Sequence, residues 1–242
     1  MLFSNSIILI TTFSAISTFF WYALYRKFRQ LYKWEEEFCA RVVAAIHAVI
    51  VVILSYISIK YGPDPIYSPG EDNTDLQVLT MLVSIGYFVY DFGWCLKHQP
   101  EPKIMLYHHL ASIVAIYYIL LHGSSGSEAV GGLGSLELTN PLLQIRWLLR
   151  SLGYMDTIVY KIIEVTFFVL FLLVRLGYGS WLLIAVVGSQ KSALPVKICT
   201  IMLYLISLAF IYSIGRFVIR KLLRGPGKPG DAIEDDDDVK LS

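Results

Sequence analysis

Apolar runs long enough to cross a lipid bilayer dominate this chain and restrict the folds that it can adopt. A transmembrane helix needs about 20 predominantly apolar residues to cross about 30 Å of hydrocarbon. We place seven such runs at residues 4–25, 39–59, 76–96, 104–122, 129–150, 158–188 and 195–219. Backbone polar groups in lipid must be satisfied within the spanning structure, which favours helices. The sequence therefore predicts an all-α polytopic membrane protein.

The composition of the 242 residues agrees with a membrane protein. It is 56% hydrophobic and 16% charged, against about 45–50% and about 25% in soluble domains. A net charge of +1 gives no reason to expect a nucleic-acid partner, and membrane lipids are the expected ones. The run at 158–188 exceeds one straight crossing, and Gly177–Ser180 is expected to kink or end it. Six spans are therefore the alternative to seven.

Basic residues flank these runs unevenly and predict an orientation. The first loop carries five of them, namely Arg26, Lys27, Arg29, Lys33 and Arg41. The second loop has a single lysine, Lys60, with Glu71, Asp72 and Asp75 among its acids, and the segment after the last run is again basic. The positive-inside rule then places the N-terminus in the lumen and the C-terminus in the cytosol. We expect an anchor helix and basic loop over 1–34, a membrane domain over 35–220 and a disordered cytosolic tail over 221–242.

Ionisable residues inside the third and fourth runs are the first candidate site. Asp91 lies late in one run, and His108 and His109 lie early in the next, so a short turn brings them to similar depth near the cytosolic side. A carboxylate can orient an imidazole and raise its basicity, which makes the three residues catalytic candidates. The alternative is that the pair only joins two helices, a bond worth about 0.6 kcal/mol in membranes.

A second polar group begins in the fifth run. Glu137, Asn140 and Gln144 share a helix face, while Pro141 lacks an N–H and clashes with the carbonyl of Glu137. We expect a kink that opens a cavity, with a kinked packing helix as the alternative, and we expect the Arg146 side chain to reach the headgroups. The candidate lipid-cavity residues are Ser84, Tyr87, Ser112, Glu137, Asn140, Gln144 and Arg146.

Neither metal nor cofactor is expected from the sequence. Cys39, Cys95 and Cys199 are isolated, with no CxxC pair or Cys/His spacing typical of zinc sites. Adjacent histidines on a helix point about 100° apart, so His108 and His109 do not form an obvious ligand pair.

Three motifs in this order resemble the TLC domain. They are Tyr87-Phe88-Val89-Tyr90-Asp91, then His108-His109, then Glu137-Leu138-Thr139-Asn140-Pro141-Leu142-Leu143-Gln144-Ile145-Arg146-Trp147. The domain is shared by ceramide synthases and translocating-chain-associating membrane proteins, and the resemblance covers about residues 35–220. It implies a barrel-like bundle of about six helices around an acyl-chain cavity, here with one more N-terminal helix. It also implies residence in the endoplasmic reticulum.

The resemblance leaves three functions open. The first is lipid handling or membrane-lipid homeostasis without established catalysis. The second is acyl transfer of the ceramide-synthase type, in which the pair matching His108 and His109 acts on acyl-CoA as substrate. The downstream His-Asp and Asp residues of those enzymes are replaced here by Glu137 and Asn140-Pro141. The third is a membrane chaperone or trafficking receptor, whose protein partners the sequence does not identify.

Overall fold

The computed structural model describes residues 6–98 and 103–224. Within these ranges the helices are α1 (Ile7–Tyr32), α2 (Glu36–Tyr61), α3 (Asp75–His98), α4 (Lys103–His122), α5 (Gly126–Glu137), α6 (Asn140–Ser151), α7 (Ile158–Leu172), the π-helix η1 (Leu173–Tyr178), α8 (Gly179–Gly188) and α9 (Leu194–Arg224). Strand pairing over the described ranges amounts to one isolated bridge, between Asp72 and Ser124. The all-α prediction is confirmed. Of the tail predicted at 221–242, residues 221–224 belong to α9 and residues 225–242 lie outside the described residues.

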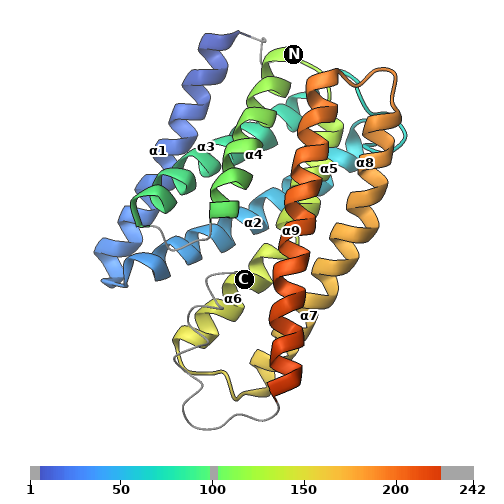
Figure 1. Cartoon of the computed structure of the whole chain (residues 1–242). Coiled ribbons are helices and arrows are strands. Elements are labelled where there is room, and N and C mark those ends of the chain that lie inside the picture. Colours follow the sequence, from blue (N-terminus) through green and yellow to red (C-terminus); the bar gives the residue numbers. More distant parts are fainter. Residues whose placement is uncertain (1–5, 99–102, 225–242) are drawn as a thin grey trace.

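The helices pack side by side as a bundle, with α1 at one flank and α8 and α9 at the other (Figure 1). Five of them, α1 to α4 and residues Leu194–Arg216 of α9, are long and apolar enough to cross a membrane. The fifth and sixth apolar runs consist of shorter pieces, α5 with α6 and α7 with η1 and α8. The chain is therefore an integral multi-pass membrane protein. We call the end where α1 stops and α2 starts, near Arg29 and Arg41, the basic end.

The fifth pass is broken where a single span was predicted. Helix α5 ends at Glu137, Leu138 and Thr139 form a turn, and α6 begins at Asn140 with Pro141 in its first turn. Proline is tolerated there because the first N–H groups of a helix have no intrahelical acceptor anyway. The steric conflict with the Glu137 carbonyl therefore ends one helix and starts another, which is a stronger effect than the predicted kink.

The sixth pass does not end where its glycines suggested. Residues 158–188 remain helical throughout, but Leu173–Tyr178 adopt π geometry between α7 and α8. Of the two outcomes expected at Gly177–Ser180, a kink or an end, the end is wrong, and the backbone instead departs from α geometry at about that level. Single π-helical turns are frequent at functional sites because they redirect side chains. Here the π segment carries the buried Arg175.

Loops at the end opposite the basic end are tied together by polar contacts. The carboxylate of Glu71 accepts a hydrogen bond from the ammonium of Lys191 and raises the pKa of that lysine above its usual value. The buried Glu128, early in α5, accepts hydrogen bonds from the hydroxyls of Ser127 (2.8 Å) and Ser192 (3.0 Å). These contacts connect the start of α5 with the loop that leads into α9.

Helix α1 approaches α3 so closely that a glycine is required at the contact. A Cβ atom added to Gly86 would lie 2.4 Å from Cβ of Ser17 and 2.7 Å from its backbone carbonyl carbon. Nearby, the indole of Trp21 donates to the Val83 carbonyl oxygen at 3.1 Å. Small residues let membrane helices approach in this way.

We expect Gly86→Val to lower stability by about 1–3 kcal/mol, because the side chain must push α1 away from α3. Gly93→Val on the same helix is the matched control, since no described atom lies within 4 Å of its added Cβ. Thermal unfolding in detergent, followed by tryptophan fluorescence, measures both variants. Equal midpoints for the two variants would show that the α1–α3 contact is not close-packed.

Candidate functional site

Two adjoining cavities lie inside the bundle. The first, the apolar cavity, has a volume of about 120 Å³ and is enclosed mainly by α4, α5, α8 and α9. The second, the polar cavity, has a volume of about 130 Å³ and is enclosed mainly by α2, α3, α6 and α7. Five residues line both cavities: Phe88, His108, Leu136, Glu137 and Arg175. Because they share this wall, we treat the two adjoining cavities together as the candidate site.

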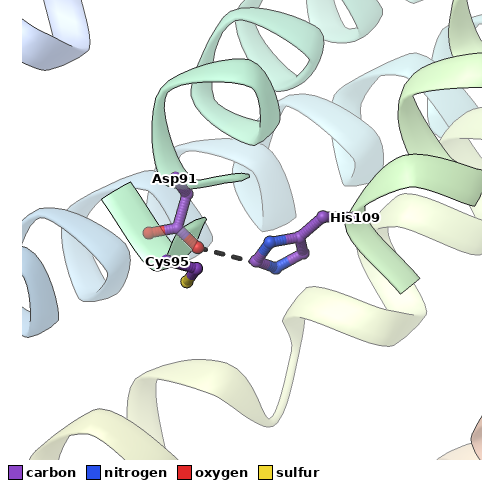
Figure 2. A group of neighbouring side chains, drawn as sticks. All are labelled: Asp91, Cys95 and His109. Atoms are coloured by element: carbon purple, nitrogen blue, oxygen red, sulfur yellow. Dashed lines mark ion pairs between the residues drawn. The ribbon is translucent and has the colours of Figure 1, made fainter. Parts of the chain in front are cut away.

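The predicted carboxylate–imidazole contact forms between α3 and α4. Nε2 of His109 lies 3.5 Å from Oδ2 of Asp91, and both residues line the polar cavity. Cys95 stands one helical turn after Asp91, and Figure 2 shows its sulfur beside the pair. The donor atoms of Asp91, Cys95 and His109 all lie within 4.8 Å of one another. The residues that could hold a metal ion therefore include a cysteine that the sequence pattern had not associated with them.

His108 has a different environment from its neighbour. It lines both cavities, is 8% exposed, and its ring lies 6.1 Å from that of Phe210. Its Nδ1 is buried with no hydrogen-bond partner among the described residues. Ser112, one turn further along α4, lines the apolar cavity. Because adjacent helix positions point apart, one histidine pairs with Asp91 while the other occupies the junction of the cavities.

A row of hydrogen bonds crosses the break between α5 and α6. The amide of Asn140 donates to Oε2 of Glu137 at 2.8 Å, and the amide of Gln144 donates to Oδ1 of Asn140 at 2.7 Å. Oε1 of Gln144 accepts from the guanidinium of Arg41 at 3.4 Å. The predicted polar face of Glu137, Asn140 and Gln144 therefore exists and lines the polar cavity. It leads from the middle of the bundle to the basic end.

Glu137 also faces an aromatic stack. Nδ1 of His47 lies 3.8 Å from Oε2 of Glu137, and the His47 ring stacks on Tyr87 with centroids 3.8 Å apart. Trp21 packs edge-on against both rings. His47 is fully buried, and neither of its ring nitrogens has a hydrogen-bond partner within the described part of the chain. The stack positions Tyr87 in the wall of the polar cavity.

Arg175 is a site residue that the sequence analysis missed. It is 8% exposed, donates to the Ser207 hydroxyl at 2.7 Å and lies 4.8 Å from the centre of the Phe171 ring. It lines both cavities and interacts electrostatically with Glu137. The available signal was an arginine in the middle of the apolar run at 158–188, a residue that membranes accept only in a protein interior or a wet cavity.

Two predicted cavity residues take part in packing instead. Ser84 is fully buried, and its hydroxyl donates to the Thr80 carbonyl at 2.9 Å, which is the usual way for a helical serine to satisfy itself. Arg146 does not reach the headgroups, because Nε binds Oε1 of Glu164 at 3.2 Å with the side chain 4% exposed. Its guanidinium also lies over the rings of Tyr160 and Phe168. Neither residue is among those that line the two cavities.

Comparison with known proteins agrees with this architecture. The family profile described as the TLC domain matches residues 37–224. TLC domain-containing protein 4-B of Xenopus laevis is 26% identical over 129 residues, which are 52% of this chain and 47% of that protein. A TLC domain-containing protein of Acanthamoeba polyphaga mimivirus, L438, is 27% identical over 104 residues, 42% of this chain and 51% of that protein. The aligned regions thus span about half the length of these relatives. The profile covers most of the chain, which therefore belongs to the TLC-domain family of membrane proteins.

Proposed function

We propose that this protein binds a lipid inside its bundle and thereby helps to set the lipid composition of its membrane. The observation that supports this most is the pair of adjoining cavities, both largely apolar, of which the second also carries the polar side chains of Arg41, Asp91, His109 and Gln144. A lipid has the same division between an acyl chain and a polar head. Such pockets, largely apolar with a few placed polar groups, are typical ligand sites.

In this proposal each cavity receives one part of the lipid. The acyl chain lies against apolar side chains of the first cavity, which include Ile116, Ile119, Leu133, Leu182 and Leu203. The carbonyl or headgroup lies at the junction, where Arg175 and His108 are available as polar contacts. Buried polar groups without partners are costly, so the unbonded Nδ1 of His108 favours a polar ligand group beside it.

We further propose that the protein resides in the endoplasmic reticulum, with a lumenal N-terminus and a cytosolic C-terminus. The support for the orientation is the concentration of arginine and lysine at the basic end. Gln144 and Arg41, at that end of the hydrogen-bonded row, would then lie towards the cytosol. The polar cavity would accordingly be loaded from the cytosolic leaflet.

Filling the apolar cavity is expected to prevent lipid binding. Gly132 lines this cavity, and an added Cβ meets only Leu182 at 3.9 Å, so Gly132→Trp can occupy the space without a clash at its first carbon. We expect ultraviolet crosslinking of a photoactivatable, clickable fatty-acid label in cells to fall to background for this variant. The label enters many lipid classes, so the assay does not presuppose the ligand.

Gly215→Trp is the matched control. It adds the same side chain within α9, where no described atom lies within 4 Å of the added Cβ and the position is not among the cavity-lining residues. Crosslinking should remain at the wild-type level in this variant. Undiminished crosslinking in Gly132→Trp would instead place the bound lipid outside the apolar cavity.

Acyl transfer is a second candidate function, favoured by the Asp91–His109 pair and by His108 in the same cavity. One histidine would take the proton from an attacking amine or hydroxyl while the acyl carbon bonds to that atom. The carbon–sulfur bond to coenzyme A would break, and the leaving thiolate would take up the proton. Purified protein that transfers no acyl group from acyl-CoA to sphingoid bases or lysolipids would contradict this candidate alone.

A further inference from the structure

The cluster of Asp91, Cys95 and His109 combines three donor types that seldom meet by chance in a membrane interior. Asp91 and Cys95 are four residues apart on α3 and so project from the same face, while His109 faces them from α4 (Figure 2). Cys95 is 4% exposed and His109 is 6% exposed. The cluster is thus a protected group of a carboxylate, a thiol and an imidazole at one wall of the polar cavity.

We propose that Asp91, Cys95 and His109 bind a zinc ion. Sulfur, nitrogen and oxygen donors together suit zinc, whereas calcium and magnesium prefer oxygen alone. Three protein ligands leave the fourth position of a tetrahedral ion open, as in zinc sites that bind water or a substrate. All three ligands line the polar cavity, so a small ligand in that cavity would lie next to the open position.

The distances are close to those that zinc requires. Tetrahedral bonds of about 2.0–2.3 Å separate neighbouring donor atoms by about 3.3–3.8 Å. Nε2 of His109 and Oδ2 of Asp91 are already 3.5 Å apart, and the whole set lies within 4.8 Å.

The charges of the ligands also fit a divalent cation. The Asp91 side chain is 15% exposed, and a carboxylate so largely removed from water is stabilised by a cation beside it. Zinc with the Asp91 carboxylate and a Cys95 thiolate is electrically neutral, and the thiol proton leaves to solvent when the metal binds. Arg41, the nearby cation on the cavity wall, also binds Glu37 at 3.1 Å and Gln144 at 3.4 Å. Arg41 therefore still has polar partners when the Asp91 carboxylate coordinates zinc.

Metal analysis of the purified full chain tests the proposal directly. The protein is prepared in detergent with a tag that contains no histidine, reconstituted with zinc, exchanged into metal-free buffer and measured by mass spectrometry. We expect one zinc per chain for the wild type and for Cys39→Ser, which alters a buried cysteine elsewhere. We expect the affinity for zinc to fall at least about tenfold in Cys95→Ser and in His109→Ala. Replacing a residue that only hydrogen-bonds to a metal ligand already lowers metal affinity by about 10–100-fold, and removing the ligand itself should lower it at least as much.

Two further measurements distinguish a specific zinc site from adventitious binding. Cobalt should give a thiolate charge-transfer band in the wild type that is absent in Cys95→Ser. Zinc should raise the unfolding temperature of the wild type but not of Cys95→Ser, which also shows whether that variant is folded. Zinc that washes out of the wild type, or that is equal in all variants, would indicate an adventitious ion only and overturn the proposal. Lipid crosslinking is independent of these results, so this proposal and the proposed function can fail separately.

Discussion

Replacing Arg146 with methionine is expected to destabilise the protein by up to about 3–5 kcal/mol, because it breaks a buried ion pair. The guanidinium Nε binds Oε1 of Glu164 at 3.2 Å, with side-chain exposures of 4% and 10%. Tyr160 also donates to this oxygen at 3.2 Å but cannot replace a positive charge. The pair connects α6 with α7, so its loss should loosen the second half of the bundle. Equilibrium unfolding in mixed micelles measures the change.

The matched control removes both charges. A buried pair replaced by apolar residues of similar volume is often neutral or even stabilising. We therefore expect Arg146→Met with Glu164→Leu to recover most of the stability lost by Arg146→Met alone. If the single variant instead unfolds like the wild type, the Arg146 charge is solvated by headgroups, as its sequence position suggested, and the Arg146–Glu164 pair does not hold in the membrane.

Replacing Glu137 with leucine is expected to have the second largest effect, a loss of about 2.5–3.5 kcal/mol, the insertion cost of an unbalanced cation. Glu137 is buried, accepts the Asn140 amide at 2.8 Å and lies within electrostatic reach of Arg175. Both interactions disappear in the variant, on either side of the break between α5 and α6. The unfolding midpoint in detergent and the yield of monodisperse protein measure the loss.

Glu137→Gln distinguishes the two contributions. Its side-chain oxygen can still accept from Asn140, but it carries no charge to balance Arg175. We expect this variant to lie between the wild type and Glu137→Leu, and addition of Arg175→Leu to restore part of the stability of Glu137→Leu. Equal stabilities of all four proteins would mean that the junction of the cavities is hydrated and that the charges are balanced by water.

Local patterns in the sequence predicted the polar site well where its residues lie on one helix or on adjacent helices. The row of Glu137, Asn140 and Gln144 follows from helical periodicity, and its hydrogen bonds form as that spacing requires. The contact between Asp91 and His109 follows from the short turn between their helices, which forces them antiparallel. In both cases local geometry leaves few alternative conformations, so the contact can be predicted from the spacing of the residues.

Contacts between distant segments could not be predicted in the same way. Helix α7 packs against α6 and brings Glu164 next to Arg146. The Arg146 side chain, which was expected at the headgroups, is therefore buried in an ion pair. His47 meets Glu137 across α2 and α5, helices whose pairing no local pattern reveals. Cys95 joins Asp91 and His109 only after α3 and α4 have packed.

Untargeted lipidomics of knockout cells tests the central claim, that the cavities act on membrane lipids, most directly. The cells are rescued at equal expression with wild type, Gly132→Trp, Gly215→Trp, or His108→Ala with His109→Ala. The account predicts that knockout changes at least one lipid class and that wild type and Gly215→Trp restore it while Gly132→Trp does not. Failure of the histidine double variant to restore that class would show that the histidine pair is required, as expected both for lipid contact through His108 and for acyl transfer. Lipid composition that is the same in every line, or that Gly132→Trp restores fully, would contradict the proposed function.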